Sequence, residues 1–466
     1  MQATAMANPL GSAPIPGLIR KYAVPSVISL LVNSLYNIVD QIFIGQGVGY
    51  LGNAATNVIF PITVIVLAFA LLIGDGAAAY LSLKLGEGRK QQAQHGVGSA
   101  ITLLVLFGII FLLIGLFFLE PLCSLFGATE NSLPYALDYG RIIVLGLPFV
   151  MIGTGLNSCI RAEGSPKIAM ISMIVGAVAN TVLDPIFIFN FGWGIQGAAW
   201  ATIIGQILTF IITIVYVPRF KTIHISRKDI KPTFRITRTI CGYGVSSFIT
   251  QVAITVSIFA ANNMLVQYGT LSAYGPDIPL AAFGIVMKVN QILIAFVIGI
   301  GIGAQPIIGF NYGAKNMKRV KHTYLIAIVI ATIISAVGFI LFQFFPQAII
   351  NLFGSEEGLY NEFAQKCFHI FLMLCIINGF QMVTGIFFQA IGKPVKAALI
   401  TLSRQILILV PAMLILPRFL GVEGVLWAGP AADCTAFVIA LLLAILEIKK
   451  LTNYRDPDME CATQLS

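Results

Sequence analysis

Charged residues are scarce in this chain of 466 residues. Lysine, arginine, aspartate and glutamate together make up 10% of it, whereas apolar residues make up 58%. A soluble domain ordinarily contains about 25% charged residues, because its surface faces water. The scarcity of charge therefore argues against a soluble globular protein and indicates a membrane protein.

Several short motifs are also missing. The seven cysteines form no CxxC pair, are odd in number and lie mostly in or beside apolar runs, so they are interpreted as small packing residues. The four histidines are scattered. Neither a GxxxxGKS or GxxxxGKT nucleotide loop nor an HExxH sequence occurs, which argues against ATP-driven transport and against an intramembrane metal enzyme. We expect no cofactor and no catalytic residues, and no cleaved signal peptide, since no positive charge precedes Arg20.

Long apolar runs are what the sequence has in abundance. Runs of about 20 residues, enough to cross a hydrocarbon core, recur from near the start almost to the end. This pattern predicts an all-α polytopic membrane protein, because a membrane barrel would show short alternating segments. Twelve transmembrane helices are predicted near residues 18–46, 52–83, 93–118, 134–158, 168–189, 197–218, 236–268, 278–312, 322–345, 361–390, 395–417 and 423–447.

The connections between these helices alternate in charge. KLGEGRK, RAEGSPK, the long loop at 219–235, AKNMKRVKH and GKPVK are basic, whereas GATENS, GPD and GSEEG are not. By the positive-inside rule, the basic loops and both termini are predicted to face the cytoplasm. The net charge of +9 then reflects topology, and no nucleic-acid partner is expected.

The second half of the chain repeats the first. A shift of 227 residues superposes Gly76 on Gly303, and the LFG at 125–127 on the LFG at 352–354. Each half holds six predicted helices, so both enter the membrane from the same side and are related by a pseudo-two-fold axis along the membrane normal. The predicted fold is two six-helix lobes. The predicted domains are an N-terminal lobe (1–218), a cytoplasmic linker loop (219–235), a C-terminal lobe (236–450) and a cytoplasmic tail (451–466).

The two halves differ in their carboxylates. At the shifted positions of Asp40 and Asp184 the second half has no acid. A charged aspartate at the centre of a spanning helix costs roughly 2.5–3.5 kcal/mol, so it persists where it faces a cavity or finds partners. Candidate partners with oxygen atoms lie at helical spacing or on neighbouring spans: Asn33, Tyr36, Asn37, Asn157, Asn180 and Thr202.

Two carboxylates, amide oxygens and a hydroxyl suit a hard cation. We interpret Asp40, Asn180, Asp184 and Thr202 as a possible Na⁺ site, or as a site where a carboxyl group removed from water takes up H⁺. The alternative is a polar cluster that only fastens helices together. Pro185 directly follows Asp184 and removes a backbone donor, so the helix can open locally there.

The remaining charges within the predicted spans have plainer interpretations. Asp75, between glycines in LIGDGAAAY, is either a second protonation or substrate contact or a satisfied internal acid. Lys288 and Arg404 have Asp433 and Glu423 as possible partners, and a structural ion pair is favoured over a substrate contact.

Over nearly its whole length the chain resembles the multidrug and toxic compound extrusion (MATE) transporters. The resemblance rests on twelve spans in two repeats and on IRAEGSPK, QAIGKPVK, GDGAAAYLSLKLGEG, GIGAQPIIGFNYGAKN and VANTVLDPIFIF. It is closest to the DinF-like prokaryotic branch, and it implies a bend at Pro25. Another branch uses a carboxylate in the seventh span, which residues 236–268 lack. The implied ion-binding set is Asp40, Asn180, Asp184 and Thr202, with Tyr36, Tyr139 and Asn157 beside it.

The resemblance also implies a function. It implies a cation-coupled antiporter, driven by H⁺ or Na⁺, that exports organic and often cationic drugs or metabolites by alternating access. The implied partners are a small-molecule substrate and membrane lipid, and the protein is expected to be a monomer in the prokaryotic inner (plasma) membrane. The alternative is a flippase for a lipid-linked saccharide, which favours several arginines to hold a diphosphate. Here only Arg141, Arg404 and Lys288 are candidates.

Overall fold

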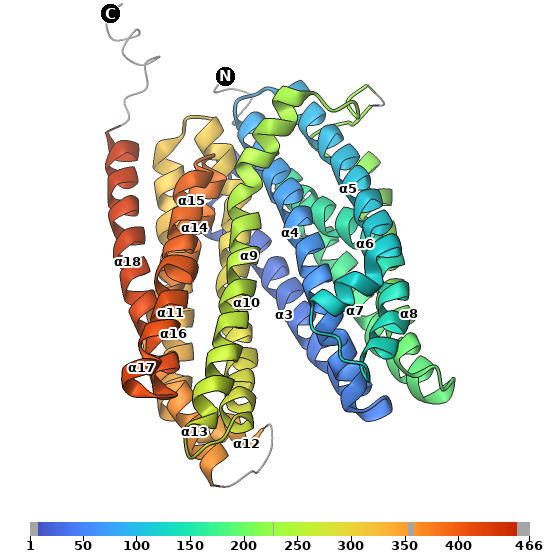
Figure 1. Ribbon diagram of the computed structural model, residues 1–466. Helices are drawn as coiled ribbons and strands as arrows, with labels where there is room; N and C mark the ends of the chain where they lie inside the picture. Colours follow the sequence, from blue (N-terminus) through green and yellow to red (C-terminus); the bar gives the residue numbers. More distant parts are fainter. Residues whose placement is uncertain (1–7, 227, 353–357, 454–466) are drawn as a thin grey trace, which may run out of the picture. The chain divides into compact units, whose positions relative to one another are not determined.

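The computed structural model describes residues 8–226, 228–352 and 358–453. In these residues the regular structure is helical (Figure 1). Eleven of the described helices are long and apolar enough to cross a membrane, and a twelfth span results if Leu359–Phe371 and Cys375–Ala390, which meet at 52°, form one bent span. The predicted twelve-span, all-α architecture is confirmed.

The first half begins with a short helix and continues with six spans. They are α2 (Pro9–Ser12), α3 (Ile15–Gly47), α4 (Tyr50–Gly86), α5 (Lys90–Leu125), α6 (Leu133–Glu163), α7 (Pro166–Pro185) with a π-helical segment (Ile186–Asn190), and α8 (Gly194–Tyr216) with a 3₁₀ turn (Val217–Arg219).

The second half follows the same plan with more interruptions. Its elements are α9 (Phe234–Thr270), α10 (Asp277–Gly313), α11 (Met317–Phe344), α12 (Pro346–Asn351), α13 (Leu359–Lys366), a π-helical segment (Cys367–Phe371), α14 (Cys375–Ala390), α15 (Pro394–Leu402), a second π-helical segment (Ser403–Leu409), α16 (Val410–Ile415), α17 (Pro417–Leu420) and α18 (Glu423–Thr452).

Prolines account for two changes of helix geometry. Pro185 has no N–H to donate to the carbonyl one turn earlier, and the helix widens into the π-helical segment directly after it. In α5, Phe118 has non-helical angles (φ −122°, ψ 18°) three residues before Pro121. Such proline-linked breaks re-aim the residues beyond them, and both occur beside features considered below.

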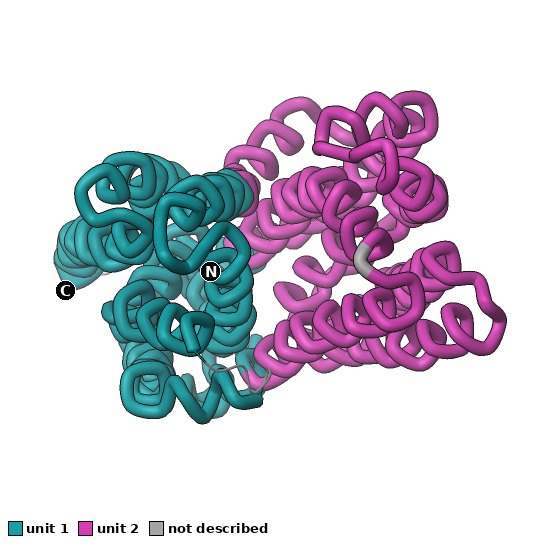
Figure 2. Tube along the Cα trace, turned by 60° about the horizontal axis from the view of Figure 1, so that its bottom comes forward, with its two compact units in different colours: residues 1–23, 85–88, 253–466 teal, residues 24–84, 89–252 magenta. Residues whose placement is uncertain are grey.

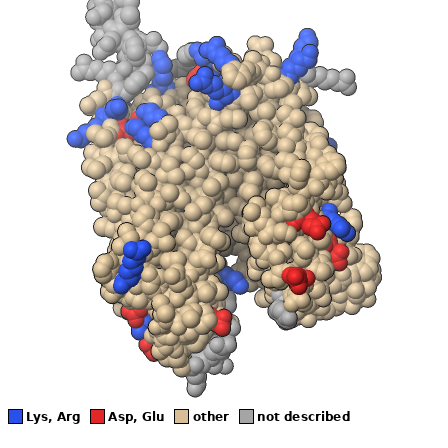
Figure 3. Space-filling view, viewed as in Figure 1, with Lys and Arg blue, Asp and Glu red and all other residues tan. Residues whose placement is uncertain are grey.

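The surface of the spans is apolar. Large side chains such as Phe117, Phe259 and Phe344 are exposed, and most of the face drawn in Figure 3 carries no charged side chain. Small residues fill the helix contacts inside, where Ala77, Ala198 and many other alanines have no exposed surface. An apolar outside and closely packed small residues inside are typical of a helical membrane protein.

The described chain divides into two compact units (Figure 2). One consists of residues 1–23, 85–88 and 253–466, and the other of residues 24–84 and 89–252. The first helix of each repeat is therefore divided between the units, since α3 is split after Ala23 and α9 after Val252. The predicted lobe boundaries at 218 and 236 follow the repeat instead and remain a prediction.

The N-terminal part of each repeat's first helix thus belongs to the unit of the other repeat, and we call these parts the exchanged helix ends. In each unit, a glycine at the same position of the repeat packs against the exchanged helix end. A Cβ on Gly76 of α4 would lie 2.1 Å from the carbonyl oxygen of Ile240 in α9, within one unit. A Cβ on Gly303 of α10 would lie 2.4 Å from Cα of Ala23 in α3, within the other. No side chain fits at such distances, so this repeated glycine lets the first helix of the opposite repeat pack at the same place in both units.

Candidate functional site

The four residues of the predicted ion-binding set lie on three helices of the unit formed by residues 24–84 and 89–252. Asp40 lies on α3 and Thr202 on α8, while Asn180 and Asp184 occupy one face of α7, one turn apart. Asp184 is completely buried and Asn180 almost so. The structure thus brings together all four residues of the predicted ion-binding set.

Asn180 holds the centre of the cluster. Its Nδ2 donates to Asp184 Oδ1 at 3.3 Å and to Thr202 Oγ1 at 3.2 Å. The amide has two N–H groups, so both are used. The remaining atom, Asn180 Oδ1, is buried and accepts no hydrogen bond from a described residue. Asn180 therefore fixes two neighbours while presenting an unsatisfied acceptor.

Two carboxyl groups meet beside this amide. The Asp40 carboxyl lies within hydrogen-bonding reach of Asp184 and beside Asn180. Asp40 Oδ1 and Asp184 Oδ2 are buried and, among the described residues, have no donor. Two ionised carboxylates can only accept, so they repel each other unless a proton or a cation is shared between them.

Two tyrosines line the cluster. Tyr139 of α6 is buried, with its hydroxyl near that of Thr202. Tyr36 lies one turn before Asp40 on α3, close enough to interact electrostatically with Asp40 and Asp184. Both tyrosines therefore lie near the carboxyl pair, where the resemblance implied them.

The predicted amides lie elsewhere. Asn37 Nδ2 donates to the Asn33 carbonyl at 2.7 Å and to Asn33 Oδ1 at 3.3 Å, so these two side chains pair along α3. Asn157 is buried on α6 and accepts a hydrogen bond from Ser172 Oγ of α7 at 2.9 Å. The structure therefore does not show these three amides in contact with the carboxyl pair.

Asp75 forms a separate polar cluster. Its Oδ1 accepts from Ser158 Oγ at 2.7 Å and its Oδ2 from Ser247 Oγ at 2.8 Å. Arg161 Nη2 in turn donates to Ser158 Oγ at 2.9 Å. The cluster joins α4, α6 and α9, and both oxygens of Asp75 have donors. This arrangement is that of a satisfied internal acid, one of the two interpretations of the sequence.

The buried aspartate of the second repeat has a counter-charge. Arg404 Nε donates to Asp433 Oδ1 at 2.6 Å, and Asn378 Nδ2 donates to Asp433 Oδ2 at 3.3 Å. The favoured ion pair between these second-repeat residues is thus present. Glu423 pairs with Lys366 at 2.8 Å, not with Lys288 or Arg404. Lys288 is exposed and, within the described residues, forms no ion pair.

The sequence analysis overlooked several polar partners. Ser158 and Ser247 donate to Asp75, and Ser172 donates to Asn157. A serine in an apolar helix is a weak signal, because it can also bond to its own backbone one turn earlier. Ser158 directly follows Asn157, and this adjacency of two polar residues was the available hint.

The donor set decides what the cluster can hold. Asp40, Asn180, Asp184 and Thr202 offer oxygen ligands of three kinds, which suit a hard cation such as Na⁺. Among the described residues, no group of three or more His, Cys, Asp or Glu is placed to bind a metal ion. Asp184 and Asn180 are buried, whereas Asp40 and Thr202 are partly buried.

Comparison with known proteins gives the relatives of this chain. Multidrug export protein MepA of Staphylococcus haemolyticus is 27% identical over 436 residues, covering 92% of this chain and 93% of the relative. MepA of Staphylococcus aureus is 24% identical over 441 residues, covering 94% and 96%. Bacterial MepA is DinF-like, in agreement with the predicted branch.

Solved structures show the fold. A MOP superfamily transporter from Pyrococcus furiosus matches with a TM-score of 0.88 at 24% identity, over 96% of this chain and 98% of that one. A crystal structure of MATE in the straight conformation matches with a TM-score of 0.89 at 24% identity, over 96% and 99%. The twelve-helix, two-lobe fold is thereby confirmed.

One family model, MatE, matches two separate stretches of the chain, residues 25–186 and 247–414. The stretches cover more than half of the chain and fall on the two repeats predicted from the sequence. With each repeat matched and the fold shared, this chain belongs to the multidrug and toxic compound extrusion (MATE) family of transporters.

Proposed function

We propose that this protein is a cation-coupled antiporter, which exports organic and often cationic compounds by alternating access in exchange for H⁺ or Na⁺. The observation that carries the proposal is the set of three buried oxygens that lack hydrogen-bond donors among the described residues: Asp40 Oδ1, Asn180 Oδ1 and Asp184 Oδ2. Buried polar atoms are nearly always satisfied, and unsatisfied ones need an explanation such as an ion. The names of the MepA relatives support drugs as the exported class.

The carboxyl pair gives a physical basis for coupling. Asp40 is carried by α3 and Asp184 by α7, so the repulsion between two ionised groups acts between these helices. Sharing a proton or a Na⁺ ion removes that repulsion and lets the groups meet. Loading and unloading the site therefore favour different positions of α3 relative to α7. A ligand shifts a conformational equilibrium only by binding one state better, and this contact supplies the difference.

The neighbouring groups suit either ion. Na⁺ would be held by oxygens of Asp40, Asn180 and Asp184, with Thr202 beside them, and its charge would offset theirs. H⁺ would protonate one of the two carboxyl groups, and the resulting O–H would donate a hydrogen bond to the other carboxylate. Asn180 serves both cases, because its N–H groups hold Asp184 and Thr202 while its oxygen stays available.

Two prolines are proposed as hinges for the resulting motion. Pro25 lies inside α3, next to the division between units at residues 23 and 24. Pro185 ends α7 beside Asp184, where the helix changes to π-helical geometry. Missing hydrogen bonds at both places lower the cost of bending. Both helices that carry the carboxyl pair can therefore bend at a proline. In α7 the proline lies beside the ion site, and in α3 it lies at the division between the units.

The orientation and surroundings belong to the same proposal. We place the protein in a prokaryotic plasma membrane as a monomer, with both termini and the 219–235 loop in the cytoplasm, because the positive-inside rule assigns basic loops to that side. Cysteine labelling of a cysteine-free background tests this orientation. Labelling of Lys228→Cys only after the membrane is permeabilised is expected, whereas labelling from outside intact cells would contradict it.

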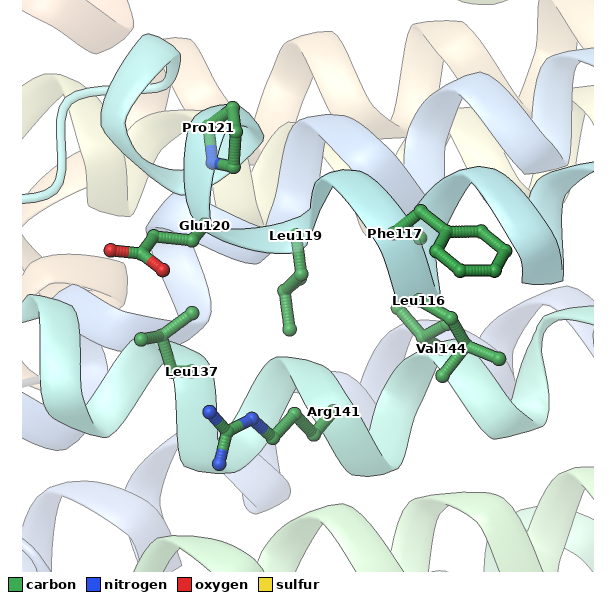
Figure 4. A pocket seen from close by; sticks show the side chains of 9 residues that line it. Leu116, Phe117, Leu119, Glu120, Pro121, Leu137, Arg141 and Val144 are labelled. Carbon is green, nitrogen blue, oxygen red and sulfur yellow. The ribbon is translucent and has the colours of Figure 1, made fainter.

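The flippase alternative has less support. Arg404 is paired with Asp433, and Arg141 lies exposed on α6, where it lines a small pocket with Glu120 (Figure 4). Of the three candidate residues for a diphosphate, Arg404 is neutralised by Asp433, and the other two lie in different repeats, Arg141 on α6 and Lys288 on α10. A diphosphate requires several basic groups, so the arrangement favours export of organic compounds.

Transport into proteoliposomes under separately imposed pH and Na⁺ gradients tests the proposed function. We expect accumulation of an organic cation such as ethidium against its own gradient when one of the two ion gradients is imposed, and none without a gradient. Equal transport with and without both gradients would show facilitated diffusion and would overturn the coupling proposal.

A further inference from the structure

A small pocket opens between α5 and α6, and no residue of the carboxyl cluster lines it. It has a volume of about 200 Å³ and combines apolar walls with one acid and one base. Figure 4 shows Glu120 extending from α5 and Arg141 from α6, with Leu119 and Leu137 between them. The pocket is lined by Gly115, Leu116, Phe117, Leu119, Glu120, Pro121, Leu137, Arg141 and Val144.

The kink of α5 contributes to this pocket. Pro121 cannot donate to the carbonyl of Phe117 one turn earlier, and Phe118 between them has non-helical angles. Gly115 packs closely on Val144 of α6, since a Cβ there would lie 2.6 Å from Val144 Cγ1. The two helices thus touch at Gly115, before the kink of α5. After the kink, the last turns of α5 leave room beside α6.

The position of the pocket along the helices corresponds to the lipid headgroup layer. In α6, the 19 residues between Arg141 and Arg161 are uncharged. At a rise of about 1.5 Å per residue they span about 29 Å, close to the roughly 30 Å of a hydrocarbon core. In α5, Glu120 is the first charged residue after the long uncharged run 96–119. Both charges therefore mark the end of the apolar zone opposite the RAEGSPK loop.

The charges of the pocket are not neutralised within the described protein. Glu120 and Arg141 are exposed, and neither forms an ion pair with a described residue. The neighbouring Phe117 is 75% exposed and Leu116 50%, as expected of side chains that face lipid tails. A ligand complementary to this site carries an anion and a cation on one small headgroup, joined to apolar chains.

We propose that the pocket binds the headgroup of a zwitterionic phospholipid with a primary amine, phosphatidylethanolamine. The phosphate pairs with Arg141 and the ammonium with Glu120, while the acyl chains lie along Leu116 and Phe117. A primary ammonium has three N–H donors, which suits Glu120 together with the Phe117 carbonyl that Pro121 leaves without its helical donor. Sites for drug-sized ligands measure roughly 300–1,000 Å³, so a pocket this small fits a headgroup better than a drug.

Native mass spectrometry of the purified full-length protein tests this lipid site. The protein is mixed with phosphatidylethanolamine, phosphatidylcholine and phosphatidylglycerol of identical acyl chains, and the retained lipids are counted. We expect at least one phosphatidylethanolamine to be retained about tenfold better than the other two lipids. Equal retention of all three lipids would overturn the proposal.

Charge variants connect retention to the pocket. Glu120→Gln and Arg141→Gln should each reduce phosphatidylethanolamine retention about tenfold, whereas Glu130→Gln, which removes an exposed acid from the loop after α5, should not. The exchange variant Glu120→Arg/Arg141→Glu should regain part of the retention, which also shows that the site folds. Unchanged retention in both single variants would contradict the proposal.

Soluble headgroup separates a lipid site from a site for small zwitterions. Glycerophosphoethanolamine, which lacks acyl chains, should displace the lipid only at concentrations at least a hundredfold higher, since the apolar contacts are lost. Displacement at equal concentration would show that the pocket recognises the headgroup alone and would contradict a lipid site.

Discussion

Each repeat buries aspartate within its spans, but the two repeats balance the charge differently. In the second repeat, Asp433 accepts hydrogen bonds from Arg404 at 2.6 Å and from Asn378 at 3.3 Å. In the first, Asp40 and Asp184 meet each other, and three nearby oxygens have no donor among the described residues. Asp433 is neutralised by a basic side chain of the protein. The carboxyl pair has no basic partner among the described residues, so a proton or a cation from solution has to offset its charge.

A second pair of buried acids shows the same contrast between the repeats. In the second repeat, Glu447 of α18 is buried and accepts hydrogen bonds from Lys393 and Lys396. Lys393 directly precedes α15, and Lys396 lies in its first turn. In the first, the acid is Glu163 at the end of α6, with neutral donors such as Ser165 at 3.0 Å and Tyr216 at 3.1 Å. The 227-residue shift pairs Glu163 with Ala390 and Glu447 with Phe220, so the two repeats place these acids, and their counter-charges, at different positions of one scaffold.

The largest expected effect comes from removing the first-repeat acids. Asp40→Asn and Asp184→Asn should each abolish export that depends on an ion gradient, because an amide matches the shape of a carboxylate but neither exchanges a proton nor offsets a cation. Transport in proteoliposomes measures this loss, with size-exclusion chromatography as a check on folding. Uphill export by either well-folded variant would remove that residue from the coupling site.

Breaking the second-repeat ion pair should instead affect stability. Asp433→Asn leaves the partly buried Arg404 without its counter-charge, which should cost up to about 3 kcal/mol, the lower end of the range for a fully buried pair. The double variant Arg404→Gln/Asp433→Asn removes both charges and should recover much of the lost stability. Thermal unfolding of the two variants measures the difference. Equal stability of the single variant and the wild type would show that the pair carries no structural role.

The exchanged helix ends offer a test of what the repeats share. Gly76→Ala and Gly303→Ala each place a methyl group against backbone of the opposite repeat's first helix. Each should lower stability by about 1–3 kcal/mol, since the backbone has to shift. Gly284→Ala in α10 meets nothing within 4 Å and should be neutral or stabilising by up to about 1 kcal/mol. A large cost for only one of the two repeated glycines would show that the packing is not equivalent.

The smallest effect concerns the loop that joins the repeats. Burial of Asp229 favours its neutral form, but hydrogen bonds from the Ser226 side chain and backbone, together with the charge of His95, outweigh it and lower the pKa of this carboxyl. A lowered pKa means that the contribution is present above the unfolded value of about 3.9 and is lost as the pH falls through the folded value.

Asp229→Asn should therefore reduce stability by about 1 kcal/mol at pH 7. The difference from the wild type should shrink as the pH falls from the unfolded value of about 3.9 through the lowered pKa of the folded carboxyl, because the wild-type carboxyl then takes up a proton. Melting temperatures recorded across this range measure it. A difference that does not change with pH would show that the ionised form of Asp229 is not what stabilises the loop.

The sequence predicted most of the fold for a physical reason. A bilayer imposes the length and apolar composition of each span, and duplication repeats glycine where backbones must meet, as at Gly76 and Gly303. The exchange of helix ends was not predicted, because hydropathy locates a helix along the chain without identifying its neighbours. Which end of α3 or α9 packs with which repeat depends on contacts far apart in sequence.

The candidate site was predictable in part. Helical spacing placed Asn180 and Asp184 on one face of α7, but periodicity cannot show that Asp40 of another helix meets Asp184. The same spacing also joined Asn33 and Asn37 to Asp40, whereas the structure pairs those two amides with each other. Local spacing indicates which residues share a face, and only packing decides what that face contacts.

The central claim is that ion coupling resides in the first repeat alone. The most direct test is the rate of export at a series of imposed ion gradients for the neutralised second-repeat variant Arg404→Gln/Asp433→Asn, compared with Asp184→Asn. The account predicts that the double variant retains the wild-type dependence on the gradient, while Asp184→Asn shows none. Loss of gradient dependence in the well-folded double variant would place a coupling site in the second repeat and contradict the account.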